Sequence, residues 1–142
     1  MPARPGSGVT VTGAGALPLH AVERIVRYVL ERERQHATIA ITFLGPRRMR
    51  ALNARYLKHD DVTDVISFGL PQPDGSVAGD VYICRYAAAR QARRLGVPVR
   101  TEVLRLLVHG TLHVLGWDHP GGAARTSSPM WRLQEQYLRR VA

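Results

Sequence analysis

The chain has 142 residues, of which 45% are hydrophobic and 22% charged, a balance that suits one compact domain with a core of its own. Its 20 lysines and arginines outnumber 11 aspartates and glutamates, and the net charge of +9 points to polyanionic partners: RNA, DNA or an anionic membrane surface. A single cysteine excludes a disulfide scaffold, the lack of an apolar run of about 18 residues excludes a membrane-spanning helix, and the absence of a leader-like N-terminus makes the cytoplasm the expected location.

The first half of the chain is predicted to alternate strands and helices. Apolar residues recur at helical spacing from Val22 to Val29 with charged residues between them, which is typical of an amphipathic helix. The β-branched run TIAITFL has no Gly or Pro and predicts a strand. After a loose tail up to about residue 8, the expected elements are a strand over 9–12, a helix over 18–34, a strand over 38–44 and a helix from 46 through Tyr56.

The second half is predicted to add a β-hairpin and three helices. Strand candidates at 63–68 and 79–86 are joined by a short turn-rich loop, which favours antiparallel pairing. Ser128 and Pro129 are expected as the N-cap and first residue of the last helix. The order β-α-β-α-β-β-α-α-α indicates the α+β class, a small mixed four-stranded sheet packed with about five helices in a single domain of residues 1–142. The three expected helices span 87–95, 100–115 and 129–140, with a loop before the last.

The most informative stretch is HGTLHVLGWDH at 109–119. His109 and His113 are four residues apart on a predicted helix, so both imidazoles face one point. Gly116 can adopt the left-handed conformation that ends the helix, after which the chain can return His119 to that point. A lone histidine on an apolar helix is usually a hydrogen-bonded core residue. Three at this spacing, with one coordination position open, predict a catalytic zinc site instead.

The same spacing occurs in metzincin proteases, which carry a glutamate general base directly after the first histidine. Here Gly110 stands at that position, so the peptidase base is missing. Glu102 lies about 10 Å away along the helix axis and is expected to be an interhelix or solvated charge. Asp118 has two open interpretations, as an acceptor that orients a histidine or as a loop cap, and Trp117 is expected to form a packing wall beside the site.

With these residues the chain resembles the YbeY family of bacterial rRNA maturation factors, described as metal-dependent endoribonucleases. The family motif H-G-x-L-H-x-x-G-x-D-H matches the stretch at 109–119. The resemblance covers roughly residues 38–140. Its further matches, in chain order, are LNARY at 52–56, TDVISF at 63–68, GDV at 79–81, and Met130 and Glu135 in the last helix.

The resemblance implies a metal site and one departure from the family. Family members usually carry an arginine directly after the tyrosine matched by Tyr56, whereas this chain has Leu57 followed by Lys58. Lys58 is a candidate to supply the missing charge, although lysine and arginine are not equivalent at a phosphate. One zinc ion per chain is expected, bound by His109, His113 and His119.

Other polar residues remain candidates for the RNA site. Ser67 and Asp80 are interpreted either as cleft residues or as polar caps of the hairpin, and His59 is expected to be a solvated loop residue. The candidate catalytic residues are Lys58, Asp80 and Asp118. The candidate RNA-binding residues are Arg55, Lys58, Ser67 and Arg85. Further arginines that are candidates to hold the RNA backbone stand at 47, 48, 50, 90, 93, 94 and 100.

The leading hypothesis is a zinc-dependent endoribonuclease specific for single-stranded RNA, acting in ribosomal RNA maturation and in ribosome assembly or quality control. Ribosomal proteins or an assembly GTPase are further expected partners, and no membrane is expected. Whether water or the ribose 2′-OH attacks the phosphodiester is left open. Two alternatives remain: a non-catalytic ribosome-assembly factor with a structural zinc, and a metalloprotease-like hydrolase, which Gly110 argues against.

Overall fold

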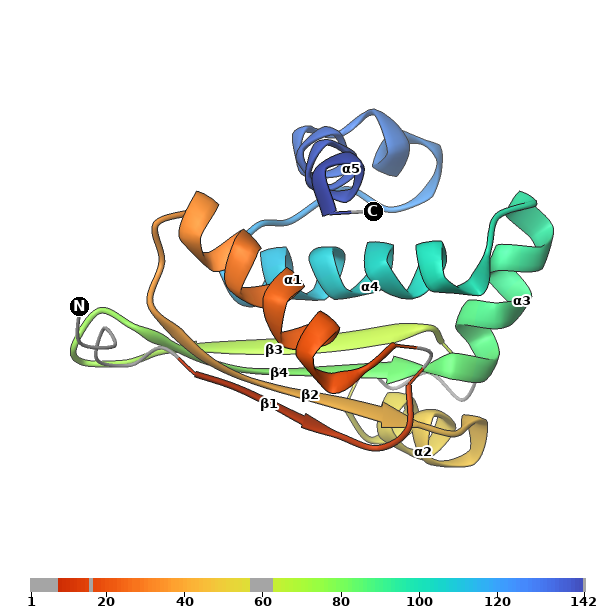
Figure 1. Cartoon of the computed structure of the whole chain (residues 1–142), viewed down its shortest axis with the longest axis horizontal. Coiled ribbons are helices and arrows are strands. Elements are labelled where there is room, and N and C mark those ends of the chain that lie inside the picture. The colour runs from red at the N-terminus through yellow and green to blue at the C-terminus, as the bar shows by residue number, and fades with distance from the viewer. Residues whose placement is uncertain (1–7, 16, 57–62, 142) are drawn as a thin grey trace.

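The computed structural model describes residues 8–15, 17–56 and 63–141 (Figure 1). The element order confirms the predicted α+β class, with one difference: a 3₁₀ helix, η1, occupies part of the segment expected to be a loop before the last helix. In chain order the elements are β1 (Gly8–Thr12), α1 (Leu19–Arg32), β2 (Ala37–Leu44), α2 (Pro46–Tyr56), β3 (Val65–Pro71), β4 (Val77–Cys84), α3 (Arg85–Leu95), α4 (Val99–Val114), η1 (Gly122–Ser127) and α5 (Pro129–Val141).

The four strands form one mixed sheet in the order β1-β2-β4-β3. Strands β1, β2 and β4 are parallel, and β3 pairs antiparallel with β4 as the predicted hairpin. Helices α1 and α4 cover one face of the sheet, α2 lies against the other, and α5 forms an outer layer on α4 (Figure 1). The edge strand β3 therefore lies beside α4, the helix that carries two of the three histidines.

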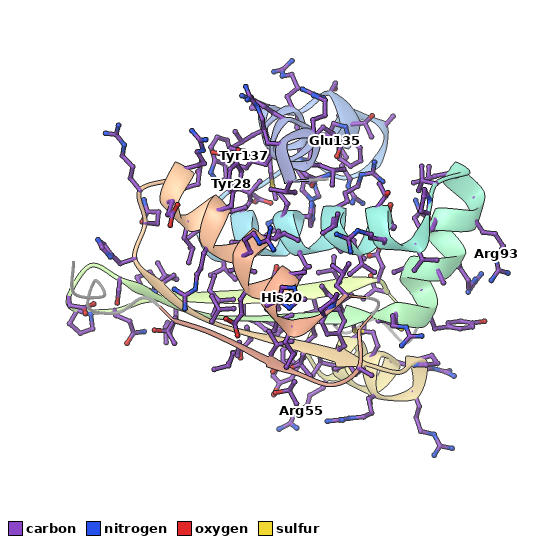
Figure 2. The ribbon with its side chains drawn as sticks, viewed as in Figure 1. His20, Tyr28, Arg55, Arg93, Glu135 and Tyr137 are labelled. Carbon is purple, nitrogen blue, oxygen red and sulfur yellow. The ribbon has the colours of Figure 1, made fainter. Side chains whose placement is uncertain are left out.

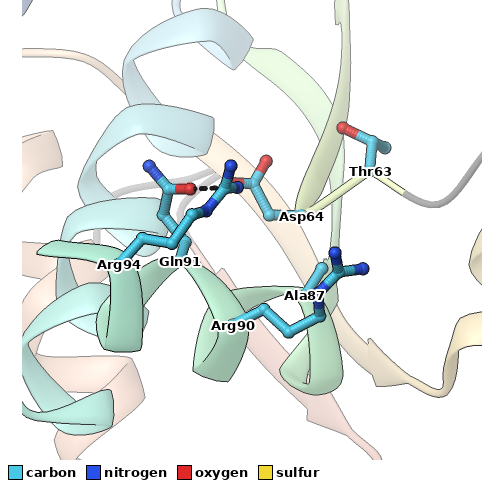
Figure 3. Close-up of a pocket in the computed structure, with 6 residues that line it drawn as sticks. All are labelled: Thr63, Asp64, Ala87, Arg90, Gln91 and Arg94. Atoms are coloured by element: carbon cyan, nitrogen blue, oxygen red, sulfur yellow. Dashed lines mark hydrogen bonds between the residues drawn. The ribbon is translucent and has the colours of Figure 1, made fainter.

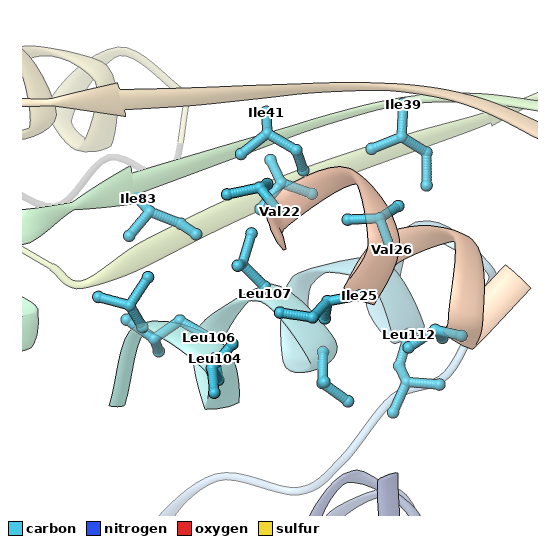
Figure 4. Close-up of a cluster of buried hydrophobic side chains, with 14 of the residues drawn as sticks. Val22, Ile25, Val26, Ile39, Ile41, Ile83, Leu104, Leu106, Leu107 and Leu112 are labelled. Atoms are coloured by element: carbon cyan, nitrogen blue, oxygen red, sulfur yellow. The ribbon is translucent and has the colours of Figure 1, made fainter. Parts of the chain in front are cut away.

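The core lies between the sheet and the helices α1 and α4. Ile39 and Ile41 of β2 point from the sheet toward Val22 and Val26 of α1, and Leu107 of α4 closes the layer (Figure 4). Helix α4 also contacts α3 and α5, so it is covered on several sides. This explains why its sequence is apolar almost all round, since a helix buried on every side has no polar face.

Helix α4 packs closely against the sheet at Gly110. A Cβ atom at this position would lie 2.5 Å from Cγ1 of Val81 on β4, closer than side chains pack. The absence of a side chain at Gly110 thus sets the depth of α4 on the sheet. Because His109 directly precedes this contact, the same approach fixes the height of the histidines above β3.

Hydrogen bonds at the C-terminal end of α1 connect the outer helix α5 with α1 and with the segment after α4. The Glu33 carboxylate accepts hydrogen bonds from the Tyr137 hydroxyl on α5 and, at 2.6 Å, from Nε1 of Trp117. Tyr137 also meets Tyr28 of α1 edge to face, with ring centroids 5.8 Å apart (Figure 2). None of the helices in the described part of the chain has the length and apolar character needed to span a bilayer.

Candidate metal centre

Three histidines converge where α4 ends. His109 and His113 lie in its last turns, and Gly116, with φ of +102°, occupies the left-handed position after the helix. The N–H groups of Gly116 and Trp117 close the helix end on the carbonyls of His113 and Leu112, each at 3.0 Å. This Schellman arrangement turns the chain back so that His119 faces the helix. One ligand atom from each of the three imidazoles lies within 4.8 Å of the others, as the spacing predicts.

The hydrogen bonds of the three rings leave one nitrogen of each free to bind a metal. Nδ1 of His113 lies 2.9 Å from the Trp117 carbonyl, and Nδ1 of His119 lies 2.9 Å from the Pro120 carbonyl. Nδ1 of His109 contacts Oε1 of Gln134. All three partners are oxygens that only accept, so each Nδ1 carries the proton and each Nε2 presents a lone pair. This donor set fits a divalent metal ion held by imidazoles.

Burial keeps the two helical imidazoles neutral. Desolvation lowers the pKa of His109 to about 4, and it also lowers the pKa of His113. Nearby positive charge, including that of Arg125, lowers both pKa values further. A metal ligand must be the neutral imidazole, so both side chains hold the form that binds a metal at neutral pH.

A chain of polar contacts supports His109 from α5. Gln134 is 1% exposed, and its Nε2 donates to Glu135 at 3.1 Å, which leaves Oε1 to accept from His109. Arg105 of α4 donates to both carboxylate oxygens of Glu135, at 3.1 and 3.2 Å, and also to Glu102. Glu102 is buried and belongs to this interhelix charge cluster, so the solvated alternative is wrong. The sequence spacing singled out the ligands but did not point to Gln134.

Replacement of Gln134 by leucine is expected to weaken zinc binding by about 10- to 100-fold, the usual effect of removing a residue that orients a ligand. The reason is that His109 loses the acceptor that fixes its tautomer and ring orientation. Competition with a chromophoric chelator measures the affinity. Gln136→Leu, the same substitution on the exposed face of α5, should change nothing. Equal zinc affinities for Gln134→Leu and the parent would exclude this role.

The imidazoles open into a cavity of about 530 Å³. Its other wall comes from the start of β3 and the segment before it, which contribute Ser67 and the pair Thr63 and Asp64. Ser67 was predicted either to face the cleft or to cap the hairpin, and the structure brings it to the cavity. Arg125 of η1 completes the lining, with its guanidinium 5.7 Å from the Trp131 ring centroid. Nothing in the histidine motif pointed to Arg125, because η1 itself was not predicted.

Asp80, a candidate catalytic residue, lies on the opposite face of the sheet from the histidines. Its neighbours Gly79 and Val81 both face α4, so the alternation of the strand directs Asp80 to the α2 side. Burial raises the pKa of Tyr82, and the charge of Asp80 on that side raises it further. The structure therefore does not bring Asp80 to the metal centre.

The loop residues beside the histidines have mainly structural contacts. The Asp118 carboxylate accepts a hydrogen bond at 2.8 Å from the His119 backbone N–H, as the loop-cap interpretation predicts, although its charge also favours protonated His113. Trp117 packs against the core as the expected wall.

The remaining RNA-binding candidates lie elsewhere. Arg55 is exposed on α2, with its guanidinium 5.3 Å from the Tyr56 ring centroid (Figure 2). Arg85 lines a separate cavity at the start of α3. Neither lines the histidine cavity. Leu57, Lys58 and His59 fall outside the described residues.

Comparison with known proteins decides the family. The sequence profile described as Endoribonuclease YbeY matches residues 16–142. The chain belongs to the YbeY endoribonuclease family. YbeY relatives include that of Persephonella marina, 32% identical over 85% of this chain and 79% of the relative, and that of Aquifex aeolicus, 42% identical over 70% and 67%. The YbeY protein of Anaeromyxobacter sp. strain Fw109-5 is 44% identical over 72% of this chain.

The chain aligns with only part of some YbeY relatives. It spans about half the length of two of them, 55% of the protein from Anaeromyxobacter sp. strain Fw109-5 and 46% of the one from Anaeromyxobacter dehalogenans. A Thermotoga maritima protein solved in solution shares the fold, with a TM-score of 0.69 and 24% identity over 94% of this chain and 89% of that one. The segment TDVISF and the histidine motif each resemble the family in sequence. In the folded chain, residues of both segments line one cavity.

Proposed function

We propose that this chain is a zinc-dependent endoribonuclease that cuts single-stranded RNA, in ribosomal RNA maturation and ribosome assembly or quality control in the cytoplasm. The observation that carries the proposal is the three-histidine centre, whose free Nε2 atoms open into a cavity lined by Arg125 in a strongly basic chain. Membership of a family described as endoribonucleases supports the reaction class. Three protein ligands leave coordination positions for substrate or water, as catalytic zinc sites require.

Several polar residues of the cavity have a chemical role in this proposal. Bound zinc would supply Lewis-acid stabilisation of a phosphoryl oxygen, or a lowered pKa for the attacking group. The Arg125 guanidinium, whose Nε has no partner among the described residues, would bind a non-bridging phosphate oxygen. The hydroxyl groups of Ser67 and Thr63 would donate hydrogen bonds to the RNA strand.

Asp64 is the residue we propose as general base. The described lining of the cavity holds two carboxylates, and that of Asp118 is already engaged with the His119 backbone. Burial raises the pKa of Asp64, although Arg125 and Arg94 oppose that shift. A raised pKa makes a carboxylate a better acceptor of the proton that leaves the attacking hydroxyl.

The alternatives are less consistent with the geometry. A structural zinc site has four protein ligands, and among the described residues the ligating group consists of the three histidines. A peptidase base at position 110 would need a side chain where a Cβ already lies 2.5 Å from Val81. A glutamate there would place a charge between α4 and the sheet, which is costly without a partner.

Cleavage of matched RNAs tests the proposed activity. The zinc-loaded protein is incubated with an end-labelled single strand and with the same strand annealed to its complement. Cutting of the free strand alone is the expected result, and the product ends assign the attacking group: a 2′,3′-cyclic phosphate excludes direct attack by water. Equal cutting of both, or of neither, would contradict the proposal.

RNA binding is expected to weaken steeply with salt. Each phosphate contact with a single strand lowers the slope of log K against log salt concentration by about 0.7. Fluorescence anisotropy of a labelled single strand, measured with metal removed to prevent cleavage, gives the slope. A binding constant that does not change with salt concentration would mean that the net charge of +9 does not contribute to RNA binding.

A further inference from the structure

A second cavity adjoins the metal cavity on the α3 side (Figure 3). It has a volume of about 280 Å³, and Thr63 and Asp64 line both cavities, so this pair forms a shared wall. The other wall is one face of α3, made of Ala87, Arg90, Gln91 and Arg94. Ligand pockets for small molecules usually measure about 300–1,000 Å³. The α3 cavity lies just below this range and has room for a charged group such as a phosphate.

Two guanidinium groups in this cavity are held in place by neighbouring side chains. Nη2 of Arg94 donates to Oε1 of Gln91 at 2.7 Å (Figure 3). The guanidinium of Arg90 lies 5.8 Å from the Tyr86 ring centroid. Arg90 and Arg94 are four residues apart on one helix, a spacing at which like charges repel. An anion bound between them would remove this repulsion, and the positioned guanidinium forks match the geometry of phosphate oxygens.

The charges along the shared wall alternate. Asp64 is the one carboxylate in the described lining of the α3 cavity. Arg125 of the metal cavity and Arg94 of the α3 cavity both act on its charge. The order Arg125, Asp64, Arg94 thus places a cation in each cavity with a carboxylate between them. Two anions separated by a neutral spacer, such as successive phosphates of a nucleic-acid strand, fit this pattern.

We propose that Arg90 and Arg94 bind the backbone phosphate next to the scissile one, so that a single RNA strand passes from the metal cavity over Thr63 and Asp64 onto α3. The ligand class is a phosphodiester of single-stranded RNA. The inference rests on the proposed function, which places the scissile phosphate at the histidines.

Binding measurements on the metal-free full chain test this subsite without requiring cleavage. The double variant Arg90→Ala, Arg94→Ala is compared with Arg139→Ala, Arg140→Ala, which removes the same charge from exposed positions on α5 that line neither cavity. We expect the α3 variant to bind a labelled single strand about tenfold more weakly and to lose about 0.7 from the salt slope, because the two arginines together neutralise one phosphate. Identical affinities and slopes for the two double variants would overturn the proposal.

A set of RNA strands, each with one neutral methylphosphonate linkage, locates the phosphate. In the parent, one linkage should weaken binding about as much as the double substitution does. In the Arg90→Ala, Arg94→Ala variant that same linkage should have no effect, because the two changes remove one interaction. Equal effects of every linkage in both proteins would overturn the subsite. If the linkage effect is present but no RNA is cut with zinc, the subsite stands and the proposed nuclease activity fails.

Discussion

Replacing His113 with alanine is expected to remove stoichiometric zinc binding. The variant keeps two imidazoles, and His109 and His119 alone cannot hold the ion in the three-nitrogen arrangement that their Nδ1 contacts prepare. His113 is only partly buried, so the fold should survive its truncation. Zinc content per chain, measured after dialysis against a weak chelator, should fall from about one to near zero in the variant.

The matched control for this experiment is His20→Ala, which makes the same substitution at an exposed position on α1 (Figure 2). It should retain zinc as the parent does. Thermal unfolding in the presence and absence of zinc gives a second reading, since a ligand that binds the folded state raises its stability. Full zinc occupancy in the His113→Ala protein would contradict the assigned centre.

Substitution of Gly110 by alanine is expected to destabilise the protein. Inside a helix, alanine stabilises the folded state by about 0.5–1 kcal/mol relative to glycine. Overpacking a core destabilises it by about 1–3 kcal/mol. The Cβ would lie 2.5 Å from Cγ1 of Val81, and β-branched Val81 cannot turn both methyl groups away. The clash should outweigh the gain in helix propensity, so the free energy of unfolding should fall by about 1–2 kcal/mol. At about 4 °C per kcal/mol for a chain of this length, Tm should fall by about 4–8 °C.

Further variants separate this clash from a general effect of removing a glycine. Gly121→Ala adds a Cβ that meets no atom within 4 Å and should leave Tm nearly unchanged. Val81→Ala creates a cavity in the parent, and it should cost less in the Gly110→Ala background, because there the truncation also relieves the clash. Scanning calorimetry measures the parent, the three single variants and the double variant. An unchanged or higher Tm for Gly110→Ala alone would show that α4 does not pack on β4 as described.

The ligands of the centre could be predicted because their geometry is local. The i, i+4 spacing of His109 and His113 and the left-handed turn at Gly116 depend on a few consecutive residues, and backbone geometry alone brings His119 back. The cap of the last helix was predictable for the same reason, and Ser128 Oγ accepts the N–H of Trp131 at 3.2 Å.

The surroundings of the centre depend on tertiary packing and could not be predicted. Gln134 meets His109 only because α5 folds back over α4, 25 residues later in the chain. Arg125 reaches the cavity through a 3₁₀ helix with no distinctive sequence pattern. The pairing of Ser67 with Val81 directs Ser67 to the histidine side and Asp80 away from it. A sequence without a known register does not specify these faces, because shifting the register by one residue reverses them.

In the proposed function, the three histidines form the metal centre of a ribonuclease. The most direct test of this proposal is cleavage of an end-labelled single-stranded RNA by the zinc-loaded parent, run beside the His113→Ala protein purified identically. We predict that the parent cuts the strand and the variant does not. Equal cutting by both would show that the activity does not depend on this centre, and a parent that binds RNA but never cuts it would contradict the claim in favour of an assembly factor.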